Sequence, residues 1–176
     1  MKGKGRYCLP LLMFIFILSM ASPGWGAEKT SPQQSLVLAL QQVPLFSRLN
    51  DSQLAKVSEV ADLLQWKAGD KIIEQGKRTG RMLIALESEV QIRIDGKLIV
   101  VLPENALVGE IEFLLEVPAT ADVVLNRDSR GIAIEHNAIR RLMDAHPGIG
   151  YILMDEIARM EANRLRTNNA QRDLPK

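Results

Sequence analysis

The spacing of apolar residues predicts two short helices at the start of the folded region. Ser31-Pro32, with Gln34 three residues after the serine, is typical of a helix start, because serine caps and proline fits the first helical position. Asn50 and Asp51 indicate a second helix in the same way. Helical spacing predicts its buried face at Leu54, Val57, Ala61 and Leu64.

From Leu63 to Glu135 the apolar period changes to two, which predicts strands. The clearest unit is a hairpin of Val90–Ile94 and Lys97–Val101, since the Asp95-Gly96 between them suits a turn that needs positive φ. In that register Ile92 faces Ile99 and Val90 faces Val101, and we expect these four on the inner face. The other expected strands are Leu63–Lys67, Lys71–Glu74, Met82–Leu86, Thr120–Asn126 and Gly131–Glu135.

The end of the chain returns to helical spacing. One helix is expected over Asn137–Ala145, and a longer one from Pro147 to about Asn168. The longer helix carries one apolar stripe, which can pack on its own domain or on a second copy of the chain: Ile149, Leu153, Ile157 and Met160.

These elements predict a mainly β fold with flanking helices. Many short strands at this spacing predict an antiparallel roll or sandwich at its centre. The expected parts are an N-terminal helix over 27–42, the roll over 43–145, the long helix over 146–170 and a tail over 171–176.

Residues 1–26 have the layout of a secretory signal peptide. Lys2, Lys4 and Arg6 precede the uncharged, mostly apolar run Leu9–Met20, and small or turn-forming residues follow it. The run is shorter than the about 20 apolar residues that span a bilayer. We therefore expect export to the periplasm or the exterior, with an uncleaved N-terminal anchor in the membrane as one alternative and initiation at Met20 as another.

Composition excludes several classes of function. The chain of 176 residues has 22 basic and 21 acidic side chains, which gives no basic excess for a nucleic-acid partner. Its one cysteine, Cys8, lies in the predicted signal peptide, and its two histidines, His136 and His146, lie outside the expected strands. We therefore expect no disulfide, no metal site and no catalytic residues, and the chain is not expected to be an enzyme.

Several stretches, in this order and spacing, resemble the cyclic-nucleotide-binding domain family. Val43–Leu49, Lys67–Ile73 with Gln75-Gly76, and Met82–Val90 resemble the first part of that domain, although Ser88 replaces the family's usual glycine. Val108–Leu115 followed by Pro118–Ala121 resembles its phosphate-binding cassette. The resemblance covers roughly residues 43 to 169. It implies an antiparallel double-stranded β-helix, or jelly roll, of about eight strands, with a C-terminal helix that often mediates dimers.

The resemblance also implies a ligand site at the cassette. In the family, the glutamate that matches Glu110 accepts a hydrogen bond from a ribose hydroxyl, and Thr120 matches a hydroxyl near the phosphate. Arg164 approximately matches a position of the terminal helix that approaches the purine in dimeric members. The candidate ligand-binding residues are Gly109, Glu110, Ile111, Ala119, Thr120 and Ala121, with Arg164 as a purine or dimer contact.

The cassette departs from the family at its central cation. The family pattern Pro-Arg-Ser/Thr-Ala reads Pro118-Ala119-Thr120-Ala121 here, and Asp122 adds a negative charge nearby. Removing one member of a desolvated charge pair costs about 2–5 kcal/mol, which is a loss of roughly 30- to several-thousand-fold in affinity. Arg127 and Arg130 lie at the far end of the same strand region, where turn charges are ordinarily solvated.

The sequence therefore favours a non-enzymatic, exported regulatory or interaction module with a degenerate pocket. It is expected to have no cofactor, to form a homodimer through the C-terminal helix and to act on an unidentified protein partner. The alternative is a working sensor that binds a cyclic nucleotide, or another small ligand, in a rearranged pocket. No helix-turn-helix pattern follows the long helix, so the resemblance does not extend to DNA-binding members.

Overall fold

The computed structural model describes residues 31–172. The predicted signal peptide and the last four residues of the predicted tail lie outside this range. No helix within 31–172 combines the length and the apolar character needed to cross a bilayer.

The first helices form where their capping residues predict them. Helix α1 (Pro32–Gln41) begins after Ser31, whose hydroxyl accepts a hydrogen bond from the backbone N–H of Gln34. A short 3₁₀ helix η1 (Pro44–Phe46) follows. Helix α2 (Asp51–Ser58) begins with a capping box, in which Asn50 and Gln53 each accept a hydrogen bond from the other's backbone N–H.

The predicted buried face of the second helix is wrong in its second half. Helix α2 ends at Ser58, and Ala61 and Leu64 belong to strand β1 (Ala61–Trp66). Strand β1 pairs residue by residue with β8 (Ser129–Glu135), so tertiary pairing decides the conformation of a segment whose local spacing also suits a helix.

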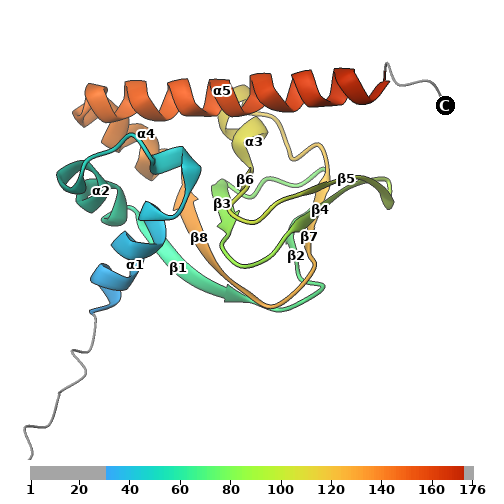
Figure 1. The fold of residues 1–176 in the computed structure, drawn as a ribbon, viewed down its shortest axis with the longest axis horizontal. Helices are drawn as coiled ribbons and strands as arrows, with labels where there is room; N and C mark the ends of the chain where they lie inside the picture. Colours follow the sequence, from blue (N-terminus) through green and yellow to red (C-terminus); the bar gives the residue numbers. More distant parts are fainter. Residues whose placement is uncertain (1–30, 173–176) are drawn as a thin grey trace, which may run out of the picture.

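Eight antiparallel strands form two four-stranded sheets, as predicted for a jelly roll. The sheet orders are β1-β8-β3-β6 and β2-β7-β4-β5 (Figure 1). The remaining strands are β2 (Lys71–Ile73), β3 (Arg81–Ala85), β4 (Val90–Ile94), β5 (Lys97–Leu102), β6 (Leu107–Val108) and β7 (Asp122–Leu125). Strand β6 was not predicted, because two residues are too short to carry a period.

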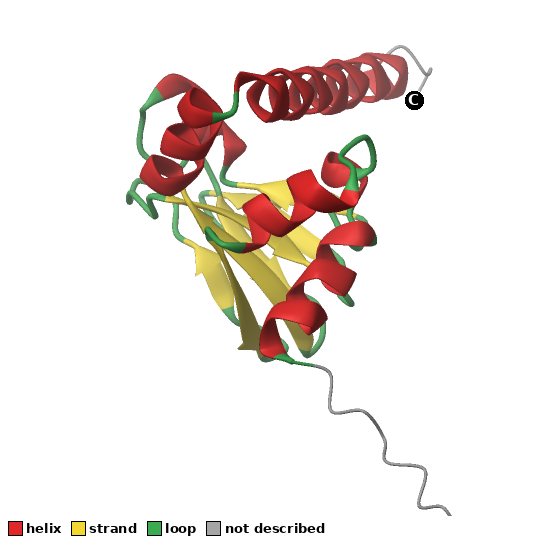
Figure 2. Cartoon of the chain, turned by 90° about the vertical axis from the view of Figure 1, so that its left-hand side faces the viewer, coloured by secondary structure: helices red, strands yellow, loops and turns green. Residues whose placement is uncertain are grey.

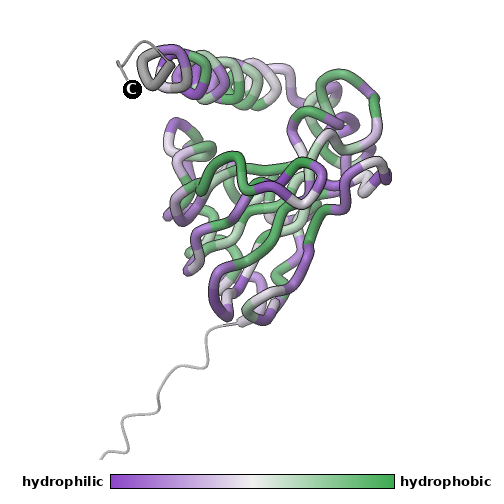
Figure 3. Tube along the Cα trace, turned by 90° about the vertical axis from the view of Figure 1, so that its right-hand side faces the viewer, coloured by the Kyte–Doolittle hydropathy of each residue, from purple (hydrophilic) through white to green (hydrophobic). Residues whose placement is uncertain are grey.

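Strand β3 of the first sheet is buried on both of its faces. Along β3, Met82 and Ile84 pack in the core shared with the helices, whereas Leu83 and Ala85 pack between the two sheets. This alternation follows from the strand period of two. Figure 2 shows the helices on one side of the strands, and Figure 3 shows hydrophobic residues gathered along the strands.

The hairpin of β4 and β5 forms, but its predicted register holds only next to the turn. Asp95 and Gly96 both have positive φ, as the turn requires. A bulge then shifts the pairing, so that Ile92 lies opposite Val100 and Val90 opposite Leu102. Ile99 and Val101 are consequently exposed, not inward-facing, because one extra residue moves every later side chain to the other face.

The C-terminal helices pack on the roll of their own chain. Helix α4 (His136–Ala145) leads into α5 (Pro147–Arg172), which runs along the top of the molecule in Figure 1 and continues past the predicted end near Asn168. Ile149, Leu153 and Ile157 of the predicted stripe are buried in the core formed with the N-terminal helices, and Met160 packs against it. Within residues 31–172 this stripe therefore faces its own domain, and a dimer along α5 stays a prediction.

Candidate functional site

A cavity of about 630 Å³ lies between the roll and α5. Strands β4 and β5, the loop before β6, helix α3 (Glu110–Leu115) and the C-terminal half of α5 supply its lining. It brings together all the residues that the sequence proposes as site residues: Gly109, Glu110, Ile111, Ala119, Thr120, Ala121 and Arg164. Its size falls within the about 300–1,000 Å³ range of small-molecule sites.

Gly109 is required by the packing of the chain itself. It has φ +85°, and a Cβ built on it would lie 2.5 Å from the carbonyl oxygen of Arg81 in β3. The sequence predicts Gly109 as a ligand-binding residue, and besides lining the cavity it makes this close approach to the backbone of β3. The glycine lets α3 begin directly beneath the cavity.

Glu110 is buried and ion-paired to the C-terminal helix. Only 5% of its surface is exposed, and its Oε1 accepts a hydrogen bond from Nη1 of Arg164 at 2.6 Å. Its other oxygen, Oε2, is buried and has no partner among the described residues. Burial raises the pKa of Glu110 above its ordinary value, although the guanidinium charge of Arg164 opposes the increase.

Arg164 is held on three sides. Besides Glu110, its guanidinium donates to the backbone oxygen of Leu107 at 2.6 Å and to Oε1 of Glu161 at 2.7 Å. Its side chain is 24% exposed, so it is not the solvated surface arginine that its place on a helix would suggest. It connects residues 54 positions apart and joins α5 to the start of α3.

A second buried carboxylate, Glu112, was not predicted from the sequence. Its oxygens accept hydrogen bonds from the backbone N–H groups of Thr79 and Gly80 and from the hydroxyl of Thr79, at 2.9, 3.1 and 3.1 Å. Burial by itself raises the pKa of Glu112, but these bonds outweigh it and the pKa lies below its usual range. Glu112 therefore fastens α3 to the loop before β3, and no local pattern distinguishes it from a solvated helix residue.

The segment around Ala119 also lines the cavity. It is anchored by two backbone hydrogen bonds, from Gly76 N–H to the Ala119 oxygen and from Ala119 N–H to the Lys77 oxygen, at 2.8 and 2.9 Å. Thr120 is exposed and Ala121 is buried.

Asp122 does not contribute its charge to the cavity lining. Its carboxylate pairs with Lys71 Nζ at 2.8 Å and accepts a hydrogen bond from the Gln75 N–H at 2.8 Å. The hydrogen bond from Lys71 is the main reason that the pKa of Asp122 lies below its ordinary value.

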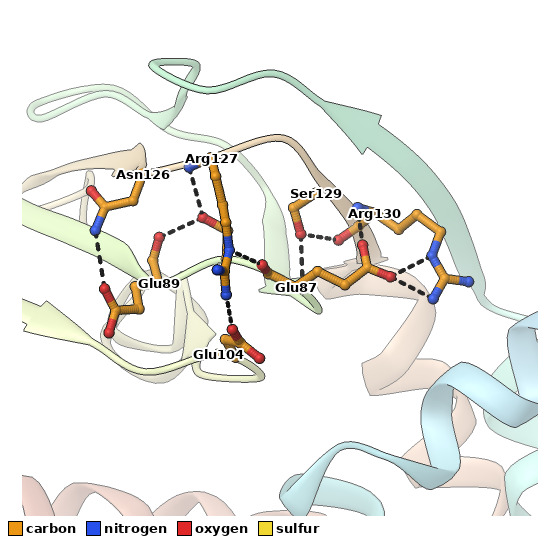
Figure 4. A network of polar contacts seen from close by, with 8 residues as sticks. Glu87, Glu89, Glu104, Asn126, Arg127, Ser129 and Arg130 are labelled. Atoms are coloured by element: carbon orange, nitrogen blue, oxygen red, sulfur yellow. Dashed lines mark hydrogen bonds and ion pairs between the residues drawn. The ribbon is translucent and has the colours of Figure 1, made fainter.

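The two arginines near the end of β7 are engaged elsewhere. Figure 4 shows Arg130 against Glu87, and Arg127 against Glu104. Arg127 also donates to the backbone oxygen of Glu87. In the described part of the chain, Arg164 is accordingly the only lysine or arginine that lines the cavity.

The two histidines lie at the two ends of α4. His136 is the first residue of α4, and its pKa is lowered by burial. His146 is the C-cap of α4, directly before α5. No group of three or more metal-ligating side chains occurs within 31–172.

Most of the roll, including the cassette segment, matches a known family. Residues 63–146 match the model of the cyclic nucleotide-binding domain. This region belongs to the cyclic nucleotide-binding domain family. The resemblance noted from the sequence is thereby confirmed, and so is the fold class that it implied.

A curated relative of this cyclic nucleotide-binding domain is a kinase regulatory protein. The cAMP-dependent protein kinase regulatory subunit of Mycosarcoma maydis is 29% identical over 123 residues, which cover 62% of this chain and 23% of the relative. The chain thus spans about a quarter of the length of that relative.

Solved structures show the same fold. A cyclic nucleotide-binding domain from Methylobacillus flagellatus has a TM-score of 0.70 at 14% identity, covering 82% of this chain and 85% of that one. The regulatory subunit of a cAMP-independent protein kinase A from Trypanosoma cruzi, bound to guanosine, has a TM-score of 0.55 at 23% identity. It covers 63% of this chain and 40% of that one.

Proposed function

We propose that this chain is a non-enzymatic regulatory or interaction module whose pocket no longer holds a cyclic phosphate. The observation that carries the proposal is the charge of the cavity lining. Its charged residues are Glu104, Glu110, Glu112 and Arg164, and the one cation is already bonded to Glu110. A cyclic phosphate placed here would add an anion to a low-dielectric site in which no lysine or arginine among the described residues is free to meet it.

The ion pair between Glu110 and Arg164 of α5 supports the same proposal. In the family, a ribose hydroxyl donates a hydrogen bond to the matching glutamate. Here such a hydroxyl would compete with the Arg164 guanidinium for the carboxylate of Glu110. A charge-assisted hydrogen bond of this kind is stronger than a neutral one. The bond between Arg164 and Glu110 therefore holds the C-terminal helix against the cavity.

Two of the similar proteins favour a regulatory role. The trypanosomal structure is that of a cAMP-independent kinase regulatory subunit, so a protein of this fold holds guanosine, a ligand without phosphate. The fungal relative is also a regulatory subunit. We propose by analogy that this module acts on a protein partner, either as a monomer or as a homodimer through α5.

We further propose that residues 1–26 direct export. The basic start, the short apolar run and the small residues that follow support this assignment. Mass spectrometry of the native N-terminus tests it: a start near residue 27 agrees with export, and a start at Met20 contradicts it.

Isothermal titration with cyclic AMP and cyclic GMP tests the proposal about the pocket. We expect no binding in the low micromolar range. The variant Ala119→Arg should gain affinity by about 30-fold or more, because it supplies the missing partner of the phosphate. Ala119→Gln is the matched control, since it adds similar bulk without charge and should not gain affinity. Low-micromolar binding by the unaltered chain would refute the proposal.

A further inference from the structure

The cavity is lined mainly by aliphatic side chains, and several of them keep exposed surface. Ile92 of β4, Val100 and Leu102 of β5, Ile111 of α3 and Met160 of α5 all line it, and each is only partly buried. A small molecule between the roll and α5 can therefore reach apolar atoms of four different elements. Contact with such atoms favours binding in proportion to the apolar area that is removed from water.

The charged side chains of the lining already have partners. Glu110 and Glu112 are each only 5% exposed, and the guanidinium of Arg164 donates to Glu110. Glu112 accepts its hydrogen bonds from the loop before β3. Glu104, which is exposed, forms an ion pair with Arg127. Among residues 31–172, the lining thus offers no charged side chain that awaits a counter-charge from a ligand.

The exposed polar side chains of the lining are uncharged, apart from the paired Glu104. They are Thr120, Asn163 and Thr167. Water next to the aliphatic walls finds few hydrogen-bond partners, so an apolar molecule displaces it at little cost. A charged molecule would lose its hydration there and gain no counter-charge.

From these observations we infer that the cavity binds a small, uncharged and predominantly apolar molecule. The volume of about 630 Å³ suits a ligand of this class. Contact with the aliphatic walls holds the ligand, which needs neither a phosphate nor a sugar. The inference deepens the proposed function and rests on it, because it names the ligand class of a pocket that no longer holds a cyclic phosphate.

Two fluorescent probes with the same aromatic body test the inference on the purified full chain. N-phenyl-1-naphthylamine is uncharged, and 8-anilinonaphthalene-1-sulfonate is the same molecule with an added sulfonate. In fluorescence titrations at pH 7 we expect the uncharged probe to bind with a stoichiometry of one per chain. The sulfonate probe should bind at least about tenfold more weakly, because its anion would be desolvated without a cation to pair with.

A variant pair then locates the bound probe. Ala119→Leu fills part of the cavity, because Ala119 lines it, and should weaken the uncharged probe at least about tenfold. Leu98→Ser is the control: Leu98 is 51% exposed on β5 outside the lining, so the variant removes exposed apolar surface and should bind the probe as the unaltered chain does. Circular dichroism checks that both variants fold, and the comparison of the two probes needs no variant.

Three outcomes overturn the inference and leave the proposed function standing. The first is equal affinity for the two probes, which would show that the cavity does not select against charge. The second is absence of binding by the uncharged probe up to its solubility limit. The third is binding that Ala119→Leu does not weaken, or that Leu98→Ser weakens equally, which would place the probe outside the cavity. Low-micromolar binding of cyclic AMP, by contrast, would refute the proposed function and the inference that rests on it.

Discussion

Replacing Arg164 with methionine should destabilise the fold, because it leaves a buried carboxylate without its charge partner. Glu110 is 5% exposed, and Arg164 is its charge partner. Removing one partner of a buried pair costs about 3–5 kcal/mol, and since Arg164 is 24% exposed, water will replace part of the loss. We therefore expect a decrease of about 2–3 kcal/mol in the free energy of unfolding at pH 7. Urea denaturation followed by tryptophan fluorescence measures it, since Trp66 packs partly buried between the sheets.

The pH dependence of the same variant gives a second test. A carboxyl whose pKa is higher in the folded state than in the unfolded state makes the fold less stable as pH rises from the unfolded pKa through the folded one. Burial raises the pKa of Glu110, and loss of Arg164 removes the main opposing influence. The stability difference between Arg164→Met and the unaltered chain should therefore be largest at neutral pH and shrink on acidification, as Glu110 takes up a proton.

A double-mutant cycle isolates the interaction. Glu110→Gln combined with Arg164→Met should cost less than the sum of the two single changes, because the uncharged amide no longer needs a cation. Arg166→Met is the matched control, since Arg166 is exposed on the same helix, and it should change stability by less than about 0.5 kcal/mol. Strictly additive effects, or an Arg164→Met variant as stable as the control, would refute the reasoning.

Two further changes test how α3 is positioned. Gly109→Ala should lower the free energy of unfolding by about 2–4 kcal/mol, because it adds a Cβ at positive φ and 2.5 Å from the Arg81 oxygen. Gly148→Ala is the control, since a Cβ there meets open space. Equal effects of the two changes in chemical denaturation would contradict this account. Glu112→Gln should cost about 2 kcal/mol at pH 7. Because the pKa of Glu112 is lowered in the fold, its stabilising contribution is present above the pKa of the unfolded state and is lost as pH falls through the pKa of the folded state. If the stability loss caused by Glu112→Gln does not shrink in acid, the acceptor is not a charged carboxylate.

Local chemistry predicted the elements well where each signal is contained in a few adjacent residues. The caps at Ser31 and Asn50 and the turn at Asp95-Gly96 form as expected, because each depends on contacts within about four positions. The bulge at Ile99 was missed, because it lies beyond the two residue pairs next to the turn, and the turn residues do not encode it. The helical spacing of Ala61 and Leu64 was misleading, because pairing with β8 outweighs local preference.

For the candidate site, too, some features follow from the sequence and others only from packing. The sequence by itself predicted most strands and turns of the roll, because periodicity, turns and caps are local properties of the chain, and the family resemblance indicated the segments of the cassette. Only the tertiary structure decided which charged side chains are paired and which are buried. It joins Arg164 to Glu110 across 54 positions, assigns Arg127 and Arg130 to other carboxylates and buries Glu112 against Thr79 and Gly80. Burial and pairing of a charge depend on neighbours brought together by packing, and a sequence pattern does not contain them.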